Sequence, residues 1–125
     1  MGKQSKLLVV EDNRETQLLI KVALRNEFDI DIADSANDAM LLLSKNKFDL
    51  VLLDLNLNGQ GDGKSILKNI REQMQNSELR VIVTTAYDLS PDDKKYFEVN
   101  ADGFLQKPFN HKVLLNSLKQ ILIKN

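Results

Sequence analysis

The chain has 125 residues, of which 42% are apolar and 28% charged, and this suits one compact domain over residues 1–125 rather than two. The charges of its 17 basic and 18 acidic residues nearly cancel, which excludes a strong overall electrostatic attraction to nucleic acid or membranes. It has no cysteine, which excludes a disulfide framework, a thiolate nucleophile and a cysteine-based metal site. Because no apolar run approaches the ~20 residues of a membrane span and the first six residues do not resemble a signal peptide, we expect a cytoplasmic protein.

The first half of the chain alternates strand-like and helix-like stretches. Residues 6–10 form a short, continuously apolar run, which predicts a strand. Residues 13–25 predict a helix with its first residue, an asparagine, as N-cap. The apolar side chains at helical spacing in this stretch are Leu18, Leu19, Val22 and Ala23. Residues 28–32 alternate apolar residues with aspartates, which predicts a strand with one solvated face, and Ser35 opens a second helix with a pattern that resembles a capping box.

The second half continues this alternation. Residues 48–53 are the most apolar run of the chain, which predicts a central strand. Residues 80–84 and 103–106 predict a fourth and a fifth strand, and Ser90 followed by Pro91 predicts the start of a fourth helix. Apolar side chains at helical spacing mark a third helix, at Ile66, Leu67, Ile70 and Met74, and a last helix, at Val113, Leu114, Leu118, Ile121 and Leu122.

Strict alternation of five strands with five helices predicts an α/β fold, in which a parallel sheet is doubly wound by helices on both faces. With right-handed crossovers the expected strand order is 2-1-3-4-5, the known order of flavodoxin-like folds. The half-solvated pattern of the second strand agrees with this order, because the order places that strand at an edge. No linker, internal repeat or low-complexity segment interrupts the chain.

In such a sheet, ligands bind beyond the carboxyl ends of the strands, near the point where the strand order reverses. The polar residues expected at this rim are Glu11, Asp12, Asp54, Thr84, Thr85 and Lys107. Three carboxylates that lie close together repel one another unless a proton or a hard cation intervenes, and Mg²⁺ prefers such oxygen ligands. With Lys107 as a positive charge, Thr85 as a hydroxyl and an aspartate as nucleophile, the set suits phosphoryl transfer through an acyl phosphate.

Four short motifs, in this order, are similar to those of the receiver domains of bacterial two-component response regulators. They are residues 8–13 (Leu-Val-Val-Glu-Asp-Asn), 52–56 (Leu-Leu-Asp-Leu-Asn), 85–86 (Thr-Ala) and 107–109 (Lys-Pro-Phe). The resemblance implies that Asp54 accepts a phosphoryl group from a histidine kinase or a histidine phosphotransfer protein. It also implies a signalling domain rather than an enzyme. Such a domain catalyses only its own phosphorylation and slow dephosphorylation. The Mg²⁺ ligands that it implies are Glu11, Asp12, Asp54 and the backbone carbonyl of Asn56.

The resemblance assigns roles to further residues. Thr85 and Lys107 match the pair that engages the phosphoryl oxygens, and Phe104 matches an aromatic residue that moves inward when the threonine does. Asn56 and Tyr87 match two positions that flank the approach of water and so set the lifetime of the acyl phosphate. We expect the Tyr87 ring to shield the phosphoryl group, because a ring excludes more water than one hydroxyl recruits.

One loop departs from the family pattern. Many receivers have a proline four residues after the acceptor, where this chain has Asn58. Three glycines among residues 59–63 allow positive φ and close approach to a partner. The shape of the 58–63 loop and its effect on partner choice stay open, as do the output target and the oligomeric state.

Several of these residues also have plainer explanations. The acids at positions 11–12 suit the N-terminus of the following helix through its dipole, and Lys107 could be an ordinary solvated lysine. Thr84 competes with Thr85, although alternation along a strand turns one of the two toward the site. Without the resemblance, Phe104 is as well explained as a core residue.

Other function classes fit parts of the pattern. A phosphatase of the haloacid dehalogenase type also uses an aspartyl nucleophile after a strand, but Asn56 stands where it needs a second acid. A flavin carrier needs a phosphate-binding loop where this chain has Glu11 and Asp12, which repel phosphate. A receiver-like module that has lost phosphorylation is disfavoured because all the site residues are present. The chain is either a free-standing regulator or a receiver excised from a hybrid histidine kinase or multidomain regulator, and we expect no direct nucleic-acid or membrane partner.

Overall fold

The structure is a computed structural model that describes residues 4–57, 62–73, 78–86 and 88–123. Within these residues, strands and helices alternate along the chain. The strands are β1 (Ser5–Val10), β2 (Phe28–Ala33), β3 (Leu50–Asp54), β4 (Arg80–Thr85) and β5 (Gly103–Gln106). The helices are α1 (Arg14–Leu24), α2 (Ala36–Lys45), α3 (Asp62–Lys68), α4 (Pro91–Asn100) and α5 (His111–Ile123), and a π-helical segment, η2 (Asn69–Gln73), follows α3 directly.

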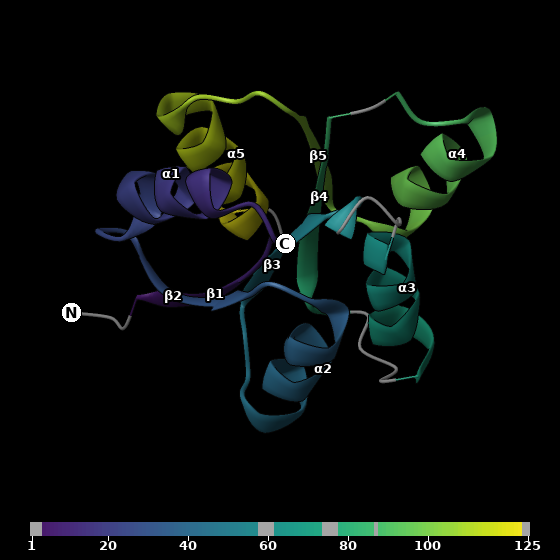
Figure 1. Ribbon diagram of the computed structural model, residues 1–125, viewed down its shortest axis with the longest axis horizontal. Helices are drawn as coiled ribbons and strands as arrows, with labels where there is room; N and C mark the ends of the chain where they lie inside the picture. The colour runs from purple at the N-terminus through teal and green to yellow at the C-terminus, as the bar shows by residue number, and fades with distance from the viewer. Residues whose placement is uncertain (1–3, 58–61, 74–77, 87, 124–125) are drawn as a thin grey trace.

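The strands form one parallel sheet in the order β2-β1-β3-β4-β5. Helices α1 and α5 cover one face of this sheet, and α2, α3 and α4 cover the other (Figure 1). The predicted doubly wound, flavodoxin-like fold is therefore confirmed, including the edge position of β2. At that edge Asp29 is exposed, as the alternating pattern predicted.

Strand β3 lies at the centre of the sheet, between β1 and β4. All five of its residues are buried, and the side chains of the first four alternate between the two apolar cores. Leu50 and Leu52 belong to the core under α1 and α5, whereas Val51 and Leu53 belong to the core under α2, α3 and α4. A strand buried on both faces has a continuously apolar sequence, which explains residues 48–53. This packing holds Asp54 at the carboxyl end of the best buried strand.

Side-chain caps mark the start of four helices: Asn110 caps α5 by accepting the N–H of Val113 at 2.8 Å, and the other three caps are predicted from the sequence. The side-chain oxygens of Asn13, Ser35 and Ser90 accept the backbone N–H three residues later, at 2.9, 3.1 and 3.2 Å. Each bond satisfies one of the donors that the first turn of a helix leaves unpaired, and the three predicted N-caps are thus confirmed. Among the helices that the structure describes, none is long and apolar enough to cross a membrane.

The apolar side chains that mark α1 and α5 in the sequence are not all buried. In α1 the buried residues are Ile20 and Leu24, whereas Leu18 is 63% exposed and Val22 is 45% exposed. In α5, Val113 is likewise exposed. Apolar side chains extend around these helices beyond the stripe that meets the sheet. Their periodicity therefore identifies the helix, while packing against the sheet decides which side chains face inward.

The third helical region also differs from the prediction of one continuous helix. It begins at Asp62, so the end of the predicted 58–63 loop is helical, while residues 58–61 lie outside the described part of the chain. The α-helix ends at Lys68 and widens into η2, and Met74 lies outside the described residues. The predicted apolar positions that are buried are Ile66, Leu67 and Ile70.

Arg71 of η2 joins this segment to two others. Its guanidinium donates to the main-chain oxygens of Leu79, at 2.7 Å, and Asn100, at 2.9 Å. It also pairs with the carboxylate of Asp102 at 3.1 Å, and that carboxylate accepts the N–H of Val81 at 2.8 Å. Arg71 therefore connects η2 to the start of β4 and to the end of α4, contacts that a periodic sequence pattern does not contain.

We expect Arg71→Ala to lower the free energy of unfolding by about 2 kcal/mol, because it removes several hydrogen bonds made by a side chain that is only 13% exposed. Urea unfolding followed by circular dichroism measures this loss. Lys119→Ala is the control, since it removes an ion pair with Glu27 whose side chains are 47% and 43% exposed, and it should cost less than about 0.5 kcal/mol. Equal losses in both variants would contradict the structural role of Arg71.

Candidate functional site

The carboxyl ends of β1, β3, β4 and β5 meet at one rim of the sheet, and backbone hydrogen bonds place the site residues there. Glu11 directly follows β1, and its N–H donates to the main-chain oxygen of Ala33, the last residue of β2, at 3.0 Å. Asp54 ends β3 and stands in register with Thr84 of β4. Lys107 directly follows β5, and its N–H donates to the main-chain oxygen of Thr85 at 2.8 Å. Residues from distant parts of the chain thus meet at this rim.

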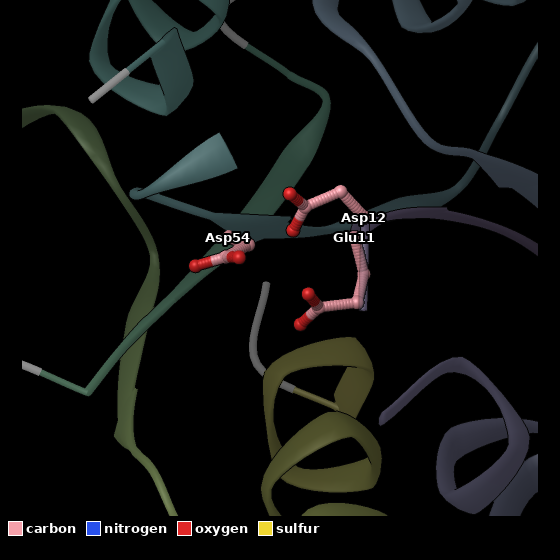
Figure 2. Close-up of side chains that lie close together, drawn as sticks. All are labelled: Glu11, Asp12 and Asp54. Atoms are coloured by element: carbon pink, nitrogen blue, oxygen red, sulfur yellow. The ribbon is translucent and has the colours of Figure 1, made fainter. Parts of the chain in front are cut away.

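Glu11, Asp12 and Asp54 form an acidic cluster at this rim. One carboxylate oxygen from each lies within 4.8 Å of the other two. Figure 2 shows Glu11 and Asp12 projecting from adjacent positions after β1, with Asp54 on the adjoining strand β3. Glu11 is 2% exposed and Asp54 is 4% exposed, so their charges are only weakly hydrated. Three oxygen donors so arranged fit a hard divalent cation such as Mg²⁺.

Lys107 places a positive charge beside this cluster. Its Nζ lies 2.6 Å from Oε1 of Glu11 and 3.4 Å from Oδ2 of Asp54. Burial alone would lower the pKa of Lys107, but the hydrogen bond with Glu11 and the charges of Glu11 and Asp54 outweigh it and raise this pKa above its ordinary value. Lys107 is therefore charged at neutral pH, and it pairs with both Asp54 and, more closely, Glu11, which is 96 positions away in the sequence.

Glu11 is held in a hydrogen-bonded, buried position. Burial raises its pKa above the ordinary value, and the charge of Asp54 adds to this effect. The contact with Lys107 and the N–H of Asn13, 3.1 Å from Oε2, act in the opposite direction without cancelling it. The main-chain oxygen of Glu11 accepts the amide of Gln17 at 2.6 Å, which ties the start of α1 to the rim.

Asn56 links Asp54 to Thr85. Its backbone N–H donates to Oδ1 of Asp54 at 3.1 Å, and its side-chain Nδ2 donates to Oγ1 of Thr85 at 2.9 Å. Thr84 and Thr85 are both buried, but among the described residues it is Thr85 that contacts Asn56. The resemblance predicts Asn56 at the site through its backbone carbonyl and beside the approach of water, but no local sequence pattern predicts its side-chain contact with Thr85.

The two remaining predicted residues have different outcomes. Phe104, on β5, is 48% exposed, so it is not a core residue in this structure. It borders a hollow of about 590 Å³ that α4 and β5 line, together with Leu89, Phe97 and Ala101. The inward movement that the resemblance implies for Phe104 stays a prediction. Tyr87 lies outside the described residues.

The chain matches the family described as the response regulator receiver domain over residues 7–119. It is similar to the solved structure of a chemotaxis response regulator of Vibrio cholerae, with 26% sequence identity and a TM-score of 0.84 over 95% of this chain and 99% of that one. It is also similar to a response regulator from Thermotoga maritima, with 27% identity and a TM-score of 0.81 over 96% of this chain and 98% of that one. A receiver domain of a Francisella response regulator matches with 26% identity and a TM-score of 0.82 over 95% and 97% of the two chains. Because the match spans most of the chain and the fold agrees, the protein belongs to the family of response regulator receiver domains of two-component systems.

Proposed function

We propose that this receiver domain accepts a phosphoryl group on Asp54 from a histidine kinase or a histidine phosphotransfer protein. The observation that carries the proposal is the convergence of four charged groups at one rim. Asp54 ends a buried strand, with Glu11 and Asp12 oxygens within 4.8 Å and the Lys107 ammonium at 3.4 Å. We propose one domain over residues 1–125 that acts in the cytoplasm and signals through protein contacts.

The proposed reaction uses Asp54 as the nucleophile. A carboxylate oxygen of Asp54 attacks the phosphorus of a phosphohistidine, a P–O bond forms, the P–N bond breaks, and the imidazole leaves. Lys107 balances the negative charge of the phosphoryl oxygens, and Thr85 offers them a hydroxyl. The Mg²⁺ ligands would be the acidic cluster and the carbonyl of Asn56, and bound Mg²⁺ supplies positive charge that offsets the carboxylates and phosphoryl oxygens.

The output follows from a change in the surface around β5. Thr85 moves toward the phosphoryl group, and Phe104 turns from its half-exposed position toward the space that Thr85 vacates. This change biases an equilibrium between two conformations of the domain. Asn56 cannot protonate a leaving group, which argues against a phosphatase that turns over its substrate.

Incubation with acetyl phosphate and Mg²⁺, followed by intact-mass measurement, tests the proposal. We expect the mass to rise by one phosphoryl group with Mg²⁺ and to stay unchanged when EDTA removes the metal, because the acidic cluster then repels the phosphodonor. Peptide mapping should place the group on Asp54. A protein that gains no phosphoryl group at millimolar Mg²⁺, or gains it elsewhere, would contradict the proposed function.

A further inference from the structure

Asn56 makes two hydrogen bonds that join the proposed acceptor to β4. The backbone N–H of Asn56 donates to Oδ1 of Asp54, and the side-chain amide of the same residue donates to Oγ1 of Thr85. The preceding residue, Leu55, donates its N–H to the main-chain oxygen of Thr84 at 2.9 Å. Asn56 is therefore fixed to the end of β4 by both its neighbour and its side chain.

The contacts continue from Thr85 to Lys107. The main-chain oxygen of Thr85 accepts the N–H of Lys107 at 2.8 Å, and the Lys107 ammonium returns to Oδ2 of Asp54 at 3.4 Å. Asp54, Asn56, Thr85 and Lys107 thus form a closed ring of contacts, which we call the Asn56 ring. Three hydrogen bonds and one ion pair connect the members of the Asn56 ring.

We propose that Asn56 is a positioning residue that couples the charge on Asp54 to the position of Thr85. This inference rests on the proposed phosphorylation of Asp54 and adds a route by which the change at the acceptor reaches β4. The route needs no further residue, because one side of Asn56 contacts the carboxylate and the other contacts the threonine hydroxyl.

The physical cause is the loss of charge on the Asp54 oxygens. In the free protein, Oδ1 belongs to a carboxylate, and its hydrogen bond from the Asn56 N–H is charge-assisted. In the acyl phosphate, a mixed anhydride, one carboxyl oxygen bridges to phosphorus and the other is a carbonyl oxygen, while the negative charge resides on the phosphoryl group. Oδ1 is then the weaker acceptor, the hydrogen bond that positions the Asn56 backbone weakens, and the Asn56 side chain holds Thr85 less firmly in the resting position.

The burial of Thr85 makes this hydrogen bond consequential. Thr85 is 0% exposed, so in the resting structure its hydroxyl oxygen depends on protein donors such as the amide of Asn56 rather than on water. Displacing the Asn56 side chain therefore changes the preferred position of the hydroxyl, and the backbone of Thr85 passes the shift to the N–H of Lys107.

A double-mutant cycle tests the resting-state contact without any phosphodonor. Asn56→Ala and Thr85→Val should each shift the folding equilibrium toward the unfolded state by about five- to tenfold. The double variant should shift the folding equilibrium by about the same factor as either single variant, and not by the product of the two factors. The reason is that both substitutions remove the same hydrogen bond, which can be lost only once. Asn56→Ala combined with Thr84→Val is the matched control, and its two factors should multiply. Multiplying factors in the Thr85 cycle would overturn the inference.

The response to phosphorylation is measured as the chemical-shift change of the Lys107 amide in ¹H–¹⁵N NMR spectra. Acetyl phosphate and Mg²⁺ phosphorylate the protein, and intact mass gives the phosphorylated fraction. Spectra of the variants are compared at equal phosphorylated fractions. The wild type and Thr85→Ser, which keeps the hydroxyl, should show a large Lys107 shift, and Asn56→Ala should lose most of it. A shift of wild-type size in phosphorylated Asn56→Ala would overturn the inference while leaving the proposed function standing. A wild type that gains no phosphoryl mass would overturn both.

Discussion

Asp54→Asn should abolish phosphorylation by acetyl phosphate and Mg²⁺, reducing the phosphorylated fraction to none in an intact-mass measurement. The neutral amide is not a nucleophile for phosphorus, whereas the carboxylate of Asp54 stands at the end of β3 with Lys107 beside it. The fold should survive, because the amide has the shape of the carboxyl group and its oxygen can still accept the Asn56 N–H. Circular dichroism of the variant checks this.

Two other aspartates give matched controls. Asp12→Asn removes a carboxylate of the same acidic cluster and should slow phosphorylation without abolishing it, because a metal ligand is lost but the nucleophile stays. Asp29→Asn changes an exposed residue of the edge strand β2 and should leave the rate at the wild-type level. If Asp54→Asn were fully phosphorylated and Asp12→Asn were not phosphorylated at all, the acceptor would be Asp12 and not Asp54.

The sequence predicts the parts of the fold that depend on local patterns. The β3 run is apolar because both faces of the strand are buried, and the alternation in β2 reflects an edge strand with one solvated face. The caps at Asn13, Ser35 and Ser90 are local interactions over three residues. Since strand order fixes which carboxyl ends adjoin, these patterns also predict that Glu11, Asp12 and Asp54 gather.

The contacts that the sequence did not predict depend on the packing of distant elements. The Lys107 ammonium lies closer to Glu11 than it does to Asp54, because the whole sheet determines where the ends of β5 and β1 lie relative to each other. The bond from Asn56 to Thr85 depends on the register of β3 and β4 together with one side-chain conformation. In α1, the apolar pattern surrounds too much of the helix to show that Ile20 and Leu24, and not Leu18, face the sheet.

Gly63→Ala should lower the free energy of unfolding by about 3 kcal/mol, a large part of the ~5–15 kcal/mol that stabilises a typical domain. Gly63 lies in the first turn of α3, buried against the end of β3. A Cβ at this position would overlap the main-chain oxygen of Asp54 and lie 2.5 Å from Cα of Leu55. These are backbone atoms at the end of the central strand and of the residue that follows it, so they cannot move aside as the end of a flexible side chain would. Urea unfolding measures the loss.

The same overlap should also reduce phosphorylation of the protein that remains folded, because any relief of the clash displaces the peptide that carries Asp54. Gly103→Ala is the matched control, since its Cβ would lie 3.3 Å from Cδ1 of Ile121 and from Cγ1 of Ile82, which are side-chain atoms. These side chains can yield, and alanine restricts the unfolded chain, so the change in stability should stay below about 1 kcal/mol. The ratio of phosphorylated to folded protein, from intact mass and circular dichroism, should therefore fall in Gly63→Ala and stay at the wild-type value in Gly103→Ala. Equal stability and equal phosphorylation in the two variants would show that α3 is not packed directly against the backbone of the acceptor.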